Sequence, residues 1–185
     1  MIIETIISTI DEKGEVNFAP FGIKRNEKFI YISPYIPSKT LNNLIFTKSA
    51  VINYINECSY FVDCVIGEKN FEKSKSNEID GYYLDNSLAH DEVKVLSVKE
   101  DKIRPTFKCE IIGEYMHKRY RGHNRANGAV IEACILATRV KMLNKIKIEN
   151  ELNYLKISVE KTAGMNELKS WQKIKKFIEN ELKKK

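Results

Sequence analysis

The hydrophobic period of the sequence becomes helical near residue 124 and stays so, and this change restricts the possible folds more than any other feature. Before that point, apolar side chains alternate with polar ones in short runs bounded by turn residues, as in β-strands. These runs cover residues 2–10, 16–23, 28–33, 50–56, 60–66, 88–98 and 106–115. After it, small and apolar residues recur every three or four positions, which is the spacing of α-helices. We therefore expect a β-sheet first and an all-helical third after it.

A run of six or more antiparallel strands followed by helices favours an antiparallel β-barrel with appended helices. We assign residues 1–120 to the barrel domain. Residues 121–185 are then a C-terminal helical extension, expected to pack on the barrel within the same structural unit. In this extension, Asn124 is placed to cap the first helix and Gly164 to separate the last two.

A short helix is predicted among the strands, over residues 38–49. Leu41 and Leu44 lie at helical spacing there, and Ser38 or Thr40 is placed to cap the helix. The polar stretch over residues 68–80 is expected to be a surface excursion between strands.

The composition describes a globular protein of a reducing compartment. Hydrophobic residues make up 43% of the chain and charged residues 30%, and no apolar run approaches the ~20 residues of a membrane span. Residues 1–10 are predicted to be a strand and not a signal peptide. The cysteines form no CxxC pair and the histidines show no metal-ligand spacing, so we expect a cytoplasmic protein without a metal.

The positive net charge is confined to the C-terminal segment. Residues 141–185 carry twelve lysines, six acidic residues and no arginine, which accounts for the whole net charge of +6. A nucleic-acid surface would combine arginine and exposed aromatic residues with these lysines, so a solvated helix face is the preferred interpretation.

One candidate binding site is the start of the short helix, where Ser38, Lys39 and Thr40 follow a proline-rich connector. A helix N-terminus offers unpaired N–H groups and a partial positive charge, and hydroxyls with an ammonium there would suit a terminal phosphate. The alternative is that Ser38 or Thr40 only caps the helix while Lys39 is solvated.

A second candidate surface is the strand that contains Ala19, Pro20 and Gly22. Small residues of this kind let a flat ring approach the main chain, whose N–H and C=O groups can bind the edge of a heteroaromatic ring. The alternative is an ordinary β-bulge or edge strand.

These residues resemble the FMN-binding split barrel superfamily, which includes flavin reductase-like and pyridoxine-phosphate-oxidase-like proteins. The resemblance lies in Asn-x-Ala-Pro-x-Gly over residues 17–22 and in Pro-Ser-Lys-Thr-x-x-Asn over residues 37–43. More narrowly, the chain is similar to the archaeal domain-of-unknown-function family 447. That similarity extends to Phe-Val-Asp-Cys at 61–64, Ala-His at 89–90, Arg-Gly-His-Asn-Arg-Ala at 121–126 and Lys-Thr-Ala-Gly at 161–164.

The resemblance implies a homodimer with one FMN per subunit near the interface. Carried over by position, it places the FMN phosphate on Ser38, Lys39, Thr40 and Asn43, and the isoalloxazine against Phe21, Gly22 and Ile23. It also places the Asn53 amide near the ring or the ribityl chain, and Asp63 and Cys64 on the following strand. The arginine-rich phosphate clamp of the pyridoxine-phosphate oxidases has no counterpart here, so no pyridoxal-phosphate substrate is expected.

Two further groups are open to a functional or a structural interpretation. Arg121 and Arg125 could bind an anionic substrate or a neighbouring subunit's ligand, or could pair with carboxylates at a dimer interface while Asn124 only caps the helix. His90 could donate a proton near the flavin, or be a buried structural histidine.

The function implied by the resemblance is that of an FMN-binding oxidoreductase, passing hydride or electrons between a nicotinamide-type donor and a second small redox molecule. No catalytic residue is assigned, since no nucleophile, base and acid gather at motif spacing. The first alternative is a flavin-binding or electron-relay module without turnover. The second is a nucleic-acid-binding protein that uses the lysine-rich segment.

Overall fold

The computed structural model describes all 185 residues, which form two compact units. The first contains Met1–Ile55 and Asn70–Tyr120, and the second contains Asn56–Lys69 and Arg121–Lys185. The second unit thus includes a segment from the middle of the chain besides the C-terminal helices. That the helices pack on the barrel stays a prediction.

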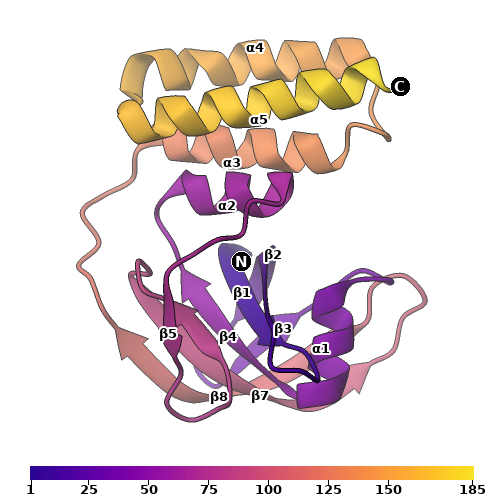
Figure 1. The fold of residues 1–185 in the computed structure, drawn as a ribbon, viewed down its shortest axis with the longest axis vertical. Coiled ribbons are helices and arrows are strands. Elements are labelled where there is room, and N and C mark those ends of the chain that lie inside the picture. The colour runs from indigo at the N-terminus through magenta and orange to yellow at the C-terminus, as the bar shows by residue number, and fades with distance from the viewer. The chain divides into compact units, whose positions relative to one another are not determined.

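The first unit is a closed antiparallel barrel with the strand order β1-β2-β3-β8-β7-β4, as predicted (Figure 1). Its strands are β1 Ile3–Ile10, β2 Val16–Arg25, β3 Phe29–Ile32, β4 Ser49–Tyr54, β7 Ala89–Lys99 and β8 Thr106–Met116. Strands β7 and β8 form the long hairpin, with irregularities in register between Glu92 and Val93 and between Val95 and Ser97.

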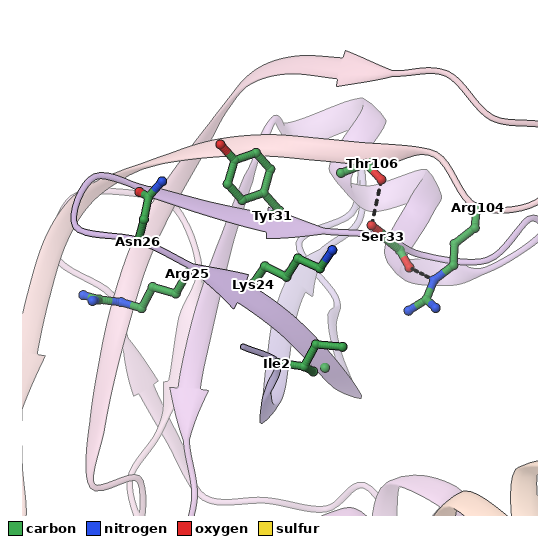
Figure 2. A pocket seen from close by; sticks show the side chains of 9 residues that line it. Ile2, Lys24, Arg25, Asn26, Tyr31, Ser33, Arg104 and Thr106 are labelled. Atoms are coloured by element: carbon green, nitrogen blue, oxygen red, sulfur yellow. Dashed lines mark hydrogen bonds between the residues drawn. The ribbon is translucent and has the colours of Figure 1, made fainter.

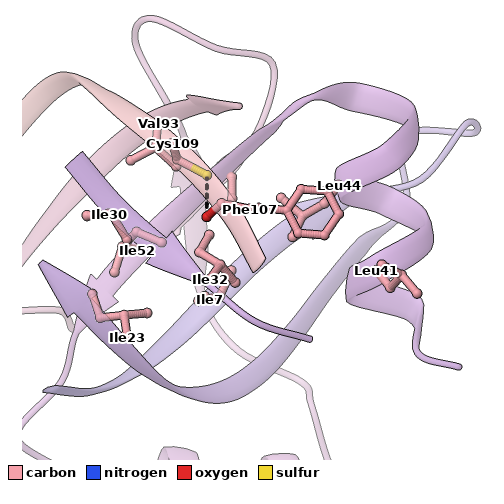
Figure 3. Close-up of a cluster of buried hydrophobic side chains, with 11 residues drawn as sticks. Ile7, Ile23, Ile30, Ile32, Leu41, Leu44, Ile52, Val93, Phe107 and Cys109 are labelled. Carbon is pink, nitrogen blue, oxygen red and sulfur yellow. Dashed lines mark hydrogen bonds between the residues drawn. The ribbon is translucent and has the colours of Figure 1, made fainter. Parts of the chain in front are cut away.

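Alternation along the strands fills the barrel interior with aliphatic side chains (Figure 3). The buried interior cluster comprises Ile7, Ile23, Ile30, Ile32, Leu41, Leu44, Ala50, Ile52, Val93, Phe107 and Cys109. The residues between these inward positions, such as Gly22, Lys24 and Tyr31, therefore lie on the outer face of the barrel.

Helix α1, Lys39–Thr47, is the helix predicted among the strands. Its N-cap is Ser38, whose hydroxyl accepts a hydrogen bond from the N–H of Leu41 at 3.2 Å, and Thr40 lies within the helix. Lys48 ends it in the left-handed conformation, with φ of 55°. Leu41 and Leu44 are buried against the barrel cluster, which fixes the position of the helix N-terminus.

The polar excursion forms a small hairpin, with β5 at Lys73–Lys75 and β6 at Tyr82–Leu84. The hairpin is bound to the barrel by Asn53 of β4, which accepts a hydrogen bond from the N–H of Leu84 at 2.8 Å.

The second unit contains four helices: α2 Cys58–Ile66, α3 Arg125–Thr138, α4 Lys145–Thr162 and α5 Met165–Lys183. The three C-terminal helices confirm the prediction, with Asn124 as the N-cap of α3 and Gly164 as the N-cap of α5. None of the helices is long and apolar enough to span a bilayer.

The prediction of a strand over residues 60–66 is wrong, because this segment lies in α2. Phe61, Val62 and Cys64 are all buried there, and so Asp63 and Cys64 lie on a helix as well. A short apolar run of this kind has the same composition whether it is a buried strand or a buried helix, and its period cannot distinguish the two.

Candidate functional site

A pocket of about 570 Å³ opens on the outer face of the barrel, beside β2, β3 and β8 and the residue that precedes β1 (Figure 2). It is lined by Ile2, Gly22, Lys24, Arg25, Asn26, Tyr31, Ser33, Arg104 and Thr106. Its walls combine apolar and aromatic surface with cations and hydroxyls, and none of the lining residues carries a carboxylate. This composition suits an organic anion that contains an apolar part.

The polar end of the pocket is ordered by hydrogen bonds. The hydroxyls of Ser33 and Thr106 lie 2.9 Å apart, and Arg104 Nε donates to the carbonyl of Ser33 at 2.6 Å. The Arg104 guanidinium also lies over the ring of Tyr35, 4.8 Å from its centre. Figure 2 shows Lys24 extending toward this end of the pocket.

Arg25 contributes little free charge to the pocket, because two carboxylates balance it. Its Nε lies 3.1 Å from Asp91 Oδ2, and a terminal nitrogen pairs with Glu114. The Tyr54 hydroxyl donates to the same Asp91 oxygen at 2.6 Å. Burial raises the pKa of Asp91, and burial together with the hydrogen bond to Asp91 raises the pKa of Tyr54.

Only part of the predicted phosphate site is available to a ligand. Lys39 is exposed and forms no ion pair, and the hydroxyl of Ser38 is partly exposed while it caps α1. Thr40 is buried, and its hydroxyl accepts a hydrogen bond from the Asn17 amide at 3.2 Å. Asn43 is also buried and donates to the Thr9 hydroxyl at 3.0 Å. The helix N-terminus therefore offers the Lys39 ammonium, the Ser38 hydroxyl and its own first N–H groups.

Of the residues predicted to line the ring, only Gly22 faces the pocket. The side chain of Ile23 is buried in the barrel cluster, and Phe21 packs against the same cluster from β2. These two residues can contact a ligand on the outer face only through their main chain.

Asn53 has a structural role in the barrel. Its amide nitrogen lies 3.0 Å from the Ile6 carbonyl and 3.4 Å from the Ser8 hydroxyl, and its oxygen accepts from Leu84. The side chain is fully buried, which leaves no surface for the predicted contact with a ring.

His90 lies in a stack of aromatic rings outside the pocket. Its ring is parallel to that of Tyr83 at 4.4 Å and stacks on Tyr115 at 4.8 Å. Its Nε2 lies 3.1 Å from Glu92 Oε1, and its Nδ1 lies 2.7 Å from Nε2 of His117. Burial lowers the pKa of His90, against the opposing effect of Glu92. These contacts favour the structural interpretation of His90.

Arg121, Asn124 and Arg125 lie in the second unit. Both arginines are exposed and form no ion pair within the chain. Asn124 accepts from the N–H of Ala126 at 2.9 Å and donates to the carbonyl of Thr162 at 2.9 Å, so it is engaged in capping α3 and binding the end of α4.

Of the residues that line the pocket, sequence reasoning named only Gly22, and the cations Lys24 and Arg104 are among those that it missed. Lys24 follows the Ala-Pro-x-Gly strand by two positions, so the β-period places it on the same face as Gly22. This periodicity could have identified Lys24 as a residue of the same surface. Arg104 reaches the pocket from the β7–β8 turn, and only the pairing of β3 with β8 brings that turn next to Ser33.

The sequence matches two family profiles along its length. Residues 3–118 match the N-terminal domain of the family described as "Protein of unknown function (DUF447)", and residues 124–176 match its C-terminal part. The chain belongs to the DUF447 family. A comparison with curated protein sequences finds no significant match.

Solved structures show the same fold. The FMN-bound DUF447 protein MM1853 from Methanosarcina mazei is 21% identical, with a TM-score of 0.81 over 95% of this chain and 94% of that one. The 2-nitrobenzoate 2-nitroreductase NbaA from Pseudomonas fluorescens is 19% identical, with a TM-score of 0.55 over 62% of this chain and 64% of that one. Flavoredoxin from Methanosarcina acetivorans is 18% identical, with a TM-score of 0.55 over 64% of this chain and 70% of that one. The fold of this DUF447 chain is thus that of the split-barrel flavin reductase-like proteins.

Proposed function

We propose that this chain is an FMN-binding oxidoreductase. The single observation that carries the proposal is its full-length structural similarity to an FMN-bound protein of the same DUF447 family. The further split-barrel neighbours, a nitroreductase and a flavoredoxin by name, support a redox role.

The residues of the outer barrel face fit FMN chemically. A phosphate needs cations and N–H donors, which Lys39, Ser38 and the first turn of α1 offer. A flat ring with a polar edge needs accessible main chain and apolar walls. Half-buried Gly22 lines the pocket together with Ile2, whose side chain lies beside it.

The distance between these two places also fits an extended FMN. Asn17, at the start of β2, is hydrogen-bonded to Thr40 beside the helix N-terminus, and Gly22 lies five residues further along the same strand. At about 3.3 Å per residue this is a span of roughly 17 Å. Such a span accommodates a ribityl phosphate and the ring attached to it.

In this arrangement FMN, when bound, supplies the hydride or electron transfer, and the protein binds and orients it. Lys39 and the start of α1 hold the phosphate, while β2 fixes the ring edge through main-chain groups. No side chain is needed as a nucleophile. Steady consumption of NADH or NADPH with an added acceptor supports turnover, whereas flavin binding without consumption supports the electron-relay alternative.

The Lys39→Ala variant tests the phosphate assignment. A hydrogen bond to a charged group contributes about 1.5–3 kcal/mol, so the variant should bind FMN roughly tenfold to a hundredfold more weakly. Riboflavin lacks the phosphate and should bind the variant and the wild type equally. Fluorescence titration measures both affinities.

Lys28→Ala, on the exposed β2–β3 turn, is the matched control and should leave FMN binding unchanged. Equal losses of FMN and riboflavin affinity in Lys39→Ala would contradict the phosphate assignment.

A further inference from the structure

The pocket on the outer barrel face has a cationic end that the proposed flavin site does not use. The exposed side chain of Lys24 lines a concave surface together with Arg104. Two positive charges therefore line this end of the pocket, and the Glu4 carboxylate lies beside Gly22.

The Arg104 guanidinium is held in place before any ligand binds. Its Nε donates to the Ser33 carbonyl at 2.6 Å, and its plane lies over the Tyr35 ring at 4.8 Å. Its two terminal nitrogens make no hydrogen bond within the chain, so their N–H groups are free for a ligand. A fixed guanidinium of this kind binds phosphate oxygens in pairs at a reduced entropic cost.

A hydroxyl pair completes this end of the pocket. Ser33 and Thr106 lie 2.9 Å apart, and one of the two hydroxyls donates to the other. The second hydrogen atom of the pair remains free to donate to an oxyanion. The pair lies on the outer face of β3 and β8, beside the carbonyl that holds Arg104.

The charge of the site selects between classes of anion. Arg25 is paired with Asp91 and Glu114, so the positive charge at this end of the pocket comes from Lys24 and Arg104. A dianionic phosphate or a pyrophosphate group matches this charge better than a single carboxylate does. The pocket of about 570 Å³ is larger than a phosphate, and its lining at Gly22 and Ile2 is the part assigned to the flavin ring.

We propose that the Lys24–Arg104 end of the pocket binds the phosphate group of a ligand other than the flavin. This inference rests on the proposed function, which assigns the flavin phosphate to Lys39 and the flavin ring to Gly22. The second ligand then meets the flavin at Gly22, which lines the same pocket. The second substrate of the proposed oxidoreductase is then a phosphate-bearing molecule.

Calorimetric titration of the FMN-saturated protein with inorganic pyrophosphate tests the proposal. We expect the wild type to bind pyrophosphate, and Lys24→Gln and Arg104→Gln each to bind it at least about tenfold more weakly. Both variants should keep the wild-type affinity for FMN. Lys28→Gln, an exposed lysine outside the pocket, should change neither affinity.

A parallel titration with ADP identifies the source of the phosphate. ADP binding tighter than pyrophosphate binding supports a nucleotide, and equal affinities support recognition of the phosphate group alone. Either result is consistent with the site only if Lys24→Gln weakens the binding of both ADP and pyrophosphate.

Two results would overturn the proposal. One is the absence of pyrophosphate binding to the FMN-saturated wild type. The other is a loss of FMN affinity, with riboflavin affinity retained, in Lys24→Gln and Arg104→Gln, which would assign these cations to the flavin phosphate. If the protein binds no flavin, the proposed function fails by itself. Pyrophosphate titration of the flavin-free wild type and of flavin-free Lys24→Gln then still tests the site. Equal pyrophosphate affinities of the two proteins, or no binding to the wild type, would overturn the proposed phosphate site.

Discussion

At the scale of single residues, the protonation of His90 is set by the groups around it. Both Glu92 oxygens accept main-chain hydrogen bonds, from the N–H groups of residues 77 and 78 at 2.7 Å and of residue 79 at 3.2 Å, so Oε1 is also placed as an acceptor for His90. His90 therefore donates from Nε2 to Glu92. Its Nδ1 is then an acceptor for His117, and the stacked rings of Tyr83 and Tyr115 exclude water from both faces.

The lowered pKa of His90 predicts a pH-dependent stability. Below its ordinary pKa of 6.5, an exposed histidine in the unfolded chain binds a proton that the buried His90 does not. The free energy of unfolding should therefore fall as the pH decreases from about 7 through 6.5 toward the folded pKa. The free energy of unfolding, measured with urea between pH 5 and 8, should change less steeply with pH in His90→Gln than in the wild type. His123→Gln, an exposed histidine, is the control, and equal slopes in all three proteins would contradict this account.

The residues that could be predicted from the sequence are those with local roles. The caps Ser38 and Asn124 act on N–H groups within three positions, so their sequence context was sufficient. Asn53, by contrast, binds partners 31 and 47 positions away, and its structural role needs the strand order to be known. Lys24 and Arg104 likewise meet only through the pairing of β2, β3 and β8.

At the scale of elements, α5 shows how a lysine-rich helix is stabilised. Trp171, Ile174 and Ile178 are buried at helical spacing, while the lysines between them are exposed. Lys173 is ion-paired with Asp63 of α2 at 3.0 Å and with Glu68 at 2.9 Å, both within the second unit. The positive charge of the segment therefore belongs to a solvated helix face.

We predict that α5 depends on its apolar face and very little on its terminal charge. Trp171→Ala should lower the free energy of unfolding by about 3–5 kcal/mol, because a large buried ring is removed. Deleting residues 183–185 should cost at most ~1 kcal/mol, since the Lys185 hydrogen bond to the carbonyl of Leu143 is exposed. Urea unfolding measures both, and a deletion as harmful as Trp171→Ala would contradict the prediction.

The elements themselves were predictable to different degrees. Strand β3 and the first part of β8 alternate between buried and half-buried positions, so alternation identified them, and α3 has a long run of small residues at helical spacing. Strands β1 and β4 are buried along nearly their whole length, and their β-rich apolar runs identified them instead. Helix α2 is apolar on most sides, with Phe61, Val62 and Cys64 buried, so the spacing of its hydrophobic residues does not identify it as a helix. Its membership in the helical unit comes from contacts such as that of Asn127 with the N–H of Cys58 at 3.1 Å.

At the scale of the whole molecule, exposed apolar side chains adjoin the cationic end of the pocket. Tyr35, Ile36 and Ile103 are 60%, 47% and 66% exposed, and the N–H of Ile36 bonds to the carbonyl of Ile103 at 2.9 Å. Arg104 lies over Tyr35 in the same region. Apolar surface at the rim of a binding pocket is typical of a protein interface.

We therefore expect a homodimer that uses this surface. Sedimentation equilibrium of the FMN-loaded protein should give twice the chain mass of 21.5 kDa. Ile103→Asp should shift the equilibrium toward monomer and weaken FMN binding, because the pocket would lose a covering wall. Met142→Asp, at an exposed position of the second unit, should do neither. A wild-type monomer that keeps one FMN per chain at nanomolar concentration would contradict the shared site.

The visible absorbance spectrum of the purified full chain, followed by mass analysis of the released cofactor, tests the central claim most directly. The account predicts a two-band flavin spectrum and the release of about one FMN per chain, either as purified or after incubation with FMN and gel filtration. A folded protein that retains no flavin after incubation with excess FMN would contradict it.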